Sequence, residues 1–140
     1  MKKKGRALAA ALLGSLLALT SCGGAGGGSA ASAAAGEYHK ISPREAKERM
    51  EAGGATVVDV RTAEEYGESH IPGAVLVPLD TIGSQRPAAL PDTGAAVLVY
   101  CRSGVRSRAA AEQLAALGYQ QVYDFGGIID WPYETVRGEE

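Results

Sequence analysis

The sequence predicts an α/β fold with a small, open, mainly parallel sheet of four to five strands and helices on both faces. Two observations carry this prediction. Short apolar runs rich in β-branched residues recur along the chain, and segments with helix-start or helix-stop signals separate them. Strands buried on both faces and connected by helices are typical of parallel sheets. The expected strands are 55–60, 73–79, 95–100 and 121–125.

The first helix has the clearest local signals. Ser42 is placed as N-cap, Pro43 occupies the first helical position, and Glu45 completes a capping box. The Gly53–Gly54 pair is expected to end this helix.

Three further helical segments are expected. Thr62 can cap one or two turns that end before His70, and a short helix is placed at 81–90. A longer, alanine-rich helix is expected from Ser107 to Leu117, closed by Gly118.

The N-terminal segment reads as an export signal. Basic residues at positions 2–4 and 6 precede an apolar stretch at 7–19 and then small residues. An uncleaved anchor helix is the alternative, but the apolar stretch is shorter than the roughly 20 residues that span a bilayer. We therefore expect residues 1–21 to be a signal peptide and the protein to be exported.

Cys22 is the expected anchor of the exported protein. The sequence "LTSC", Leu19 to Cys22, resembles the lipobox of bacterial lipoproteins, which implies lipid modification of Cys22 as the first mature residue. Two or three acyl chains would hold the protein at the cell membrane, facing the periplasm or the exterior. Residues 22–36 are rich in Gly, Ala and Ser, so they are expected to form a flexible tether before a single domain at 37–140.

Charge and cysteine content limit the possible functions. Removing the four basic residues of the signal from the formal charge of −2 leaves −6, which gives no reason to expect nucleic-acid binding. Once Cys22 is lipidated, Cys101 is the one thiol left, and it has no partner for an internal disulfide. An unpaired cysteine of this kind is either reactive or buried and inert.

The sequence around Cys101 favours a reactive thiol. Cys101 comes directly after the strand 95–100, and ligands bind at the carboxyl ends of strands in open α/β sheets. Backbone N–H groups of the following loop and the positive end of the next helix would stabilise a thiolate there. Arg102 and Arg106 add positive charge that can bind an oxyanion, whereas a core cysteine, the alternative, needs neither arginine.

Three motifs in order resemble the rhodanese-type sulfurtransferases. "CRSGVRS" is similar to their active-site loop, "DVRTAEEYGESHIPGAVLVPL" to their upstream signature, and "DFGGIIDW" to their closing segment. Ser69 departs from the family, which usually has glycine before the histidine. Together the motifs cover nearly the whole expected domain.

The resemblance implies a two-step mechanism without a cofactor. A sulfane donor such as thiosulfate would transfer its outer sulfur to Cys101, and cyanide or a thiol would then remove it from the persulfide. A thioredoxin-like protein is a further acceptor that this mechanism would accommodate, and we expect a monomer. The loop residues expected to surround the reacting sulfur are Arg102, Ser103, Gly104, Val105 and Arg106.

Supporting roles are expected for three residues outside this loop. By resemblance Asp59 and Arg61 brace the site, although an ion pair that only ties two loops is equally compatible with the sequence. Ser107 follows the loop at the start of the expected helix. A low-pKa thiolate needs no general base, so His70 is expected to be structural, and two histidines with one free cysteine give no reason to expect a metal site.

Two other functions stay open. A non-catalytic module on the same fold could bind an anion or a protein through the same loop. Related phosphatases need five residues between cysteine and arginine, but four residues separate Cys101 from Arg106 and six separate it from Arg108. The shorter loop argues against phosphate chemistry.

Overall fold

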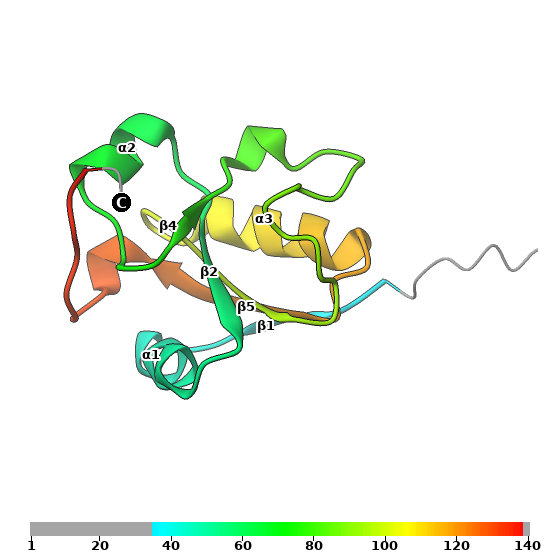
Figure 1. Ribbon diagram of the computed structural model, residues 1–140, viewed down its shortest axis with the longest axis horizontal. Helices are drawn as coiled ribbons and strands as arrows, with labels where there is room; N and C mark the ends of the chain where they lie inside the picture. Colours follow the sequence, from blue (N-terminus) through cyan, green and yellow to red (C-terminus); the bar gives the residue numbers. More distant parts are fainter. Residues whose placement is uncertain (1–34, 139–140) are drawn as a thin grey trace, which may run out of the picture.

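The computed structural model describes residues 35–138, which form one five-stranded sheet with helices on both sides (Figure 1). The expected signal peptide, Cys22 and all but the last two residues of the expected tether lie outside the described residues. The strand order is β1-β5-β4-β2-β3 and every pairing is parallel, as predicted. The strands are β1 (Tyr38–Lys40), β2 (Ala55–Asp59), β3 (Val75–Leu76), β4 (Ala96–Cys101) and β5 (Gln121–Gly127).

Side chains of the central strand β4 alternate between two apolar layers. Val97, Val99 and Cys101 belong to the layer that includes α3 (Val105–Ala116), whereas Leu98 and Tyr100 belong to the layer that includes α1 (Pro43–Ala52). This alternation follows from the two-residue period of a strand. It places the sulfur of Cys101 on the α3 side of the sheet.

The helix starts at α1 and α2 (Ala63–Glu68) agree with the sequence prediction. The Ser42 hydroxyl accepts a hydrogen bond from the Glu45 N–H, and Gly53 ends α1 with φ of 78°. At α2, Thr62 and Glu65 form a complete capping box, in which each side chain accepts a bond from the other residue's N–H. Local capping chemistry therefore fixes both helix starts.

Three expected elements differ from the structure. The strand expected at 73–79 is reduced to β3, since Pro78 has no N–H to donate. The helix expected at 81–90 is absent, and a 3₁₀ turn, η1 (Leu79–Thr81), precedes that stretch instead. α3 begins at Val105, two residues before the expected Ser107, because Gly104 takes a left-handed conformation and starts the helix without a side-chain cap.

Strand β1 was not predicted. It has only three residues, two of them the exposed polar residues His39 and Lys40, so it carries no apolar pattern. It pairs with β5 at the edge of the sheet, where Lys40 lies opposite Asp124. A second 3₁₀ turn, η2 (Ile128–Asp130), follows β5.

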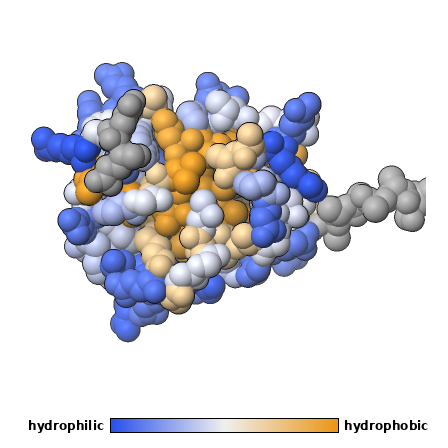
Figure 2. Space-filling view, viewed as in Figure 1, coloured by the Kyte–Doolittle hydropathy of each residue, from blue (hydrophilic) through white to orange (hydrophobic). Residues whose placement is uncertain are grey.

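The carboxyl ends of β2, β4 and β5 meet at one edge of the sheet. The β4–β5 register shifts between Val99 and Cys101, which sets Cys101 opposite Gly127 at the very end of the pairing. The face shown in Figure 2 has apolar residues gathered at its centre and hydrophilic residues around them. No helix within residues 35–138 is long and apolar enough to span a bilayer.

Candidate active site

Cys101 lies at the floor of a short loop between β4 and α3. The residue is only 1% exposed, and its Sγ accepts a hydrogen bond from the Gly104 N–H at 3.0 Å. Gly104 has φ of 99°, a conformation that L-residues rarely adopt, and this turns the backbone N–H toward the sulfur. The thiol is thus as buried as a core cysteine. It is nevertheless held by the polar loop that the sequence predicts around a reactive cysteine.

Hydrogen bonds to the sulfur lower the pKa of Cys101. Burial alone would raise it, because a thiolate loses hydration in the interior. The N–H and hydroxyl of Ser107 and the N–H groups of Gly104 and Ser103 outweigh that effect. These donors favour the thiolate, which is the nucleophilic form of cysteine.

Arg106 is bound to a carboxylate rather than left open for a ligand. Its Nη1 and Nη2 lie 2.7 and 2.8 Å from the two oxygens of Glu65 on α2. The Arg106 guanidinium holds the pKa of Glu65 at about 2, and the Thr62 N–H and hydroxyl act in the same direction against partial burial. Arg102 and Ser103 are exposed at the loop surface, and Arg102 forms no ion pair within residues 35–138.

Asp59 and Arg61 form a buried ion pair at the end of β2. Arg61 Nε and Nη2 donate to the Asp59 carboxylate at distances of 2.7–3.1 Å. Arg61 Nη2 also donates to the Ser69 carbonyl at 2.6 Å. Tyr100 donates its hydroxyl to Asp59 at 2.7 Å. Burial and the Asp59 charge together raise the pKa of Tyr100 well above its usual range. These contacts tie the β2 end to the segment before His70.

His70 occupies a structural position, as the sequence led us to expect. It is 1% exposed, its Nδ1 lies 2.9 Å from the Tyr66 carbonyl, and its ring stacks on Tyr66. Its backbone pairs with Val136.

Three further residues at this edge were not identified from the sequence. Glu65 holds Arg106, as described above. Asp124 on β5 is fully buried and accepts the Ser107 hydroxyl at 2.7 Å, and the Lys40 ammonium on β1 lies 3.5 Å from its other oxygen. For Asp124 the sequence does carry a signal, since it is the one charged residue in the run 121–125 and the first residue of "DFGGIIDW".

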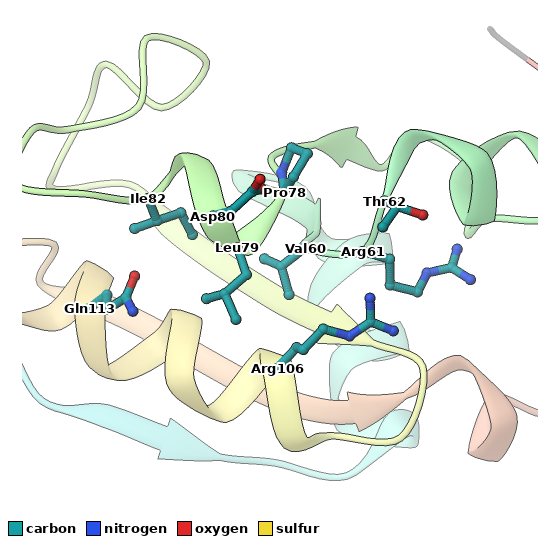
Figure 3. Close-up of a pocket in the computed structure, with 9 residues that line it drawn as sticks. All are labelled: Val60, Arg61, Thr62, Pro78, Leu79, Asp80, Ile82, Arg106 and Gln113. Atoms are coloured by element: carbon teal, nitrogen blue, oxygen red, sulfur yellow. The ribbon is translucent and has the colours of Figure 1, made fainter.

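A cleft of about 470 Å³ runs beside the loop, between α3 and the η1 segment. Figure 3 shows Arg61 and Arg106 together at one end, and Ile82 and Gln113 at the other. Leu79 projects between them toward α3. The cleft gives the loop an apolar flank on the α3 side of the sheet.

Gly127 brings η2 directly against the loop. A Cβ at Gly127 would lie 2.1 Å from the Arg102 carbonyl oxygen and 2.6 Å from the Ser103 Cα. The Ile129 N–H also donates to the Arg102 carbonyl at 3.3 Å. Val105, the first residue of α3, and Ile129 of η2 are the two most exposed large apolar residues near this contact, at 76% and 63%.

Comparison with known proteins agrees with this geometry. The family model of the rhodanese-like domain matches residues 42–132. The thiosulfate sulfurtransferase PspE of Escherichia coli is 37% identical over 81 residues, which cover 58% of this chain and 78% of PspE. GlpE of Ectopseudomonas mendocina, also a thiosulfate sulfurtransferase, is 35% identical over 109 residues, 74% of this chain and 97% of GlpE.

Solved structures show the same likeness. A rhodanese from E. coli, solved with anions, has a TM-score of 0.56 and 38% identity, covering 60% of this chain and 99% of that one. A human single-domain sulfurtransferase has a TM-score of 0.60 and 26% identity, covering 66% of this chain and 93% of that one. With the family match spanning most of the described domain, the chain belongs to the rhodanese-like family.

Proposed function

We propose that the protein is a sulfurtransferase that moves a sulfane sulfur from a donor such as thiosulfate to cyanide or a thiol, through a persulfide on Cys101. The observation that carries the proposal is the position of Sγ under a loop whose N–H groups point at it. Relatives named thiosulfate sulfurtransferases support the choice of donor.

In the first step the Cys101 thiolate attacks the outer sulfur of thiosulfate. The Sγ–S bond forms as the S–S bond of thiosulfate breaks, and sulfite leaves with the electron pair of that bond. The negative charge passes from Sγ to the terminal sulfur of the persulfide. Loop N–H groups favour both anions, as fixed dipoles do at sites of developing charge.

In the second step a nucleophile attacks the terminal sulfur. Cyanide would leave as thiocyanate, and a thiolate would leave as a new persulfide. In either case the electron pair of the broken S–S bond returns to Sγ as thiolate. A small thiol and the exposed cysteine of a thioredoxin-like protein are both chemically competent acceptors.

Exposed Arg102 is the best placed loop cation to meet the anionic donor, because Glu65 already engages both terminal nitrogens of Arg106. A guanidinium binds an oxyanion with two parallel N–H bonds. The E. coli rhodanese solved with anions is consistent with such a role for this region of the fold.

Intact mass after incubation with thiosulfate tests the proposal. The Cys22→Ser background leaves Cys101 as the one cysteine, and Cys101→Ser in that background is the control. We expect a gain of one sulfur, about 32 Da, only when Cys101 is present, and its loss on adding cyanide. A folded protein that gains no sulfur from thiosulfate or an organic persulfide would instead favour the binding module without turnover.

We also propose that the mature protein is anchored through lipid on Cys22. The support is the lipobox-like "LTSC" behind an export signal. Expression of the full chain in a bacterium fed a labelled fatty acid should place the label in the membrane fraction. Cys22→Ser should abolish the label and release the protein, and label that persists in Cys22→Ser would refute the anchor.

A further inference from the structure

Asp124 is a buried carboxylate that the sulfur-transfer steps above do not use. It is 0% exposed at the end of β5, where one of its oxygens accepts the Ser107 hydroxyl at 2.7 Å and the Gly126 N–H at 2.9 Å. A buried charge needs such partners to offset the loss of hydration. The Ser107 hydroxyl is also among the groups that lower the pKa of Cys101. It lies 3.2 Å from the Gly126 carbonyl, and the next residue, Gly127, is the strand partner of Cys101, so one hydroxyl stands between the carboxylate and the nucleophile.

The Ser107 hydroxyl carries a single proton and can donate it to one acceptor at a time. Its short, charge-assisted bond is to Asp124, and the contact with the Gly126 carbonyl, at 3.2 Å, is longer. While the proton points to Asp124, an oxygen lone pair faces the sulfur. That arrangement suits a sulfur that is a thiol or part of a persulfide, and it does not suit a thiolate.

We propose that the Ser107 hydroxyl turns between the Asp124 carboxylate and the Cys101 sulfur during turnover, and that Asp124 is therefore a positioning residue that competes with the sulfur for this proton. The inference rests on the proposed function. When Sγ is a thiolate, the hydroxyl donates to it. When the persulfide forms and the charge moves to the outer sulfur, the hydroxyl returns to Asp124. In the second step it turns again to meet the leaving thiolate.

Lys40 sets the strength of this competition. Its ammonium, on the edge strand β1, lies 3.5 Å from the Asp124 oxygen that does not contact Ser107, and it is close to Gly104 of the loop. By offsetting part of the carboxylate charge, Lys40 weakens the hold of Asp124 on the Ser107 proton. The other charged groups near the sulfur are exposed Arg102 of the loop, Arg106 of α3, held by Glu65, and the Asp59–Arg61 pair at the end of β2.

The test measures the Cys101 pKa in the absence of any sulfur donor. In the full chain carrying Cys22→Ser, the rate of alkylation by iodoacetamide as a function of pH reports the thiolate. Asp124→Asn should lower the Cys101 pKa by about one unit, a tenfold gain in thiolate below the pKa, because the anionic competitor is gone. A pKa that rises or stays unchanged in folded Asp124→Asn would overturn the proposal.

A second pair of variants covers the case in which Asp124→Asn does not fold. Lys40→Gln, on a side chain 68% exposed, should raise the Cys101 pKa by a few tenths of a unit. Arg108→Gln removes an exposed cation on α3 that pairs with Glu112 and should leave the pKa unchanged. Equal shifts in both variants would show a general field effect and refute the role of Asp124.

Ser107→Ala tests whether Asp124 acts on Cys101 through the Ser107 hydroxyl or directly through its own charge. In that background Asp124→Asn should shift the Cys101 pKa much less than it does when Ser107 is present. An undiminished shift would mean that Asp124 acts on the sulfur without Ser107, against the proposal. None of these measurements needs a persulfide. They can therefore refute the role of Asp124 independently of the mass experiment that tests the sulfurtransferase proposal.

Discussion

Arg106 on α3 and Glu65 on α2 lie 41 residues apart in the sequence and form a two-pronged ion pair, with N–O distances of 2.7 and 2.8 Å. The same Glu65 carboxylate accepts the Thr62 N–H in the capping box of α2. One side chain thus completes a helix cap and holds an arginine of the active-site loop. The pair decides how much positive charge the loop presents to a donor.

Glu65→Gln is expected to strengthen the binding of thiosulfate. The substitution leaves the Arg106 charge uncompensated beside the loop, and a divalent anion gains from that charge at low salt. We expect KM for thiosulfate to fall about threefold to tenfold at low ionic strength, and the effect to shrink at high salt. Glu64→Gln, an exposed acid on the same helix, is the control and should change KM little. An unchanged or higher KM in Glu65→Gln would show that the pair orients Arg106 for the donor.

The same pair should make stability depend on pH. The folded pKa of Glu65 is lowered to about 2, below the value near 4.3 of an unfolded glutamate. The pair therefore stabilises the fold above about pH 4.3, and this contribution is lost as pH falls toward 2. In urea unfolding at pH 7, Glu65→Gln should lose about 1–2 kcal/mol, a modest figure because the pair is partly exposed. The difference from the unsubstituted protein should disappear near pH 2, and a constant difference across pH would contradict the assignment.

The parts of the fold that were predicted from sequence depend on local signals. Ser42 and Thr62 cap helices with donors only three residues away, and the apolar runs identify the buried strands. The start of α3 was placed two residues late, because the left-handed Gly104 begins this helix and no side-chain cap marks its start in the sequence. The Ser107 hydroxyl is directed to Asp124 on another strand. Strand β1 was missed because pairing with β5, and not its own composition, makes it a strand.

The candidate site could be predicted only in part for a related reason. Cys101 and its loop are contiguous, so their spacing in the sequence carries information. The partners that tune the loop come from other strands and helices: Glu65 for Arg106, Asp124 for Ser107, and Lys40 for Asp124. Such pairings depend on the sheet order, which a single sequence does not specify.

Tyr100→Phe is expected to destabilise the fold without impairing sulfur transfer. The Tyr100 hydroxyl donates to Asp59 and accepts the Ile71 N–H at 3.1 Å, so its removal leaves two buried polar groups short of a partner. A loss of about 1–3 kcal/mol in urea unfolding is expected. Its side chain points to the α1 layer, opposite Cys101, so persulfide formation should proceed at the original rate. Tyr133→Phe, at a more exposed tyrosine, is the control; equal losses in both variants would argue against the buried network.

Gly127 is expected to be essential to the loop for steric reasons and not for backbone freedom. Its φ of −121° is open to any residue, but a Cβ there would lie 2.1 Å from the Arg102 carbonyl oxygen, so Gly127→Ala must push the loop away from η2. That movement would displace the N–H groups that stabilise the Cys101 thiolate. We expect the persulfide-forming rate to fall at least tenfold and the Cys101 pKa to rise.

Gly53→Ala is the matched control for this substitution. Gly53 has φ of 78° at the end of α1, and a Cβ there would meet no atom within 4 Å, so an added methyl group costs only backbone strain, about 1 kcal/mol. It should lower stability and leave persulfide formation unchanged. If Gly127→Ala also kept its full rate in the mass assay, the contact between η2 and the loop would have no part in holding the thiolate, and the loop alone would suffice to build the site.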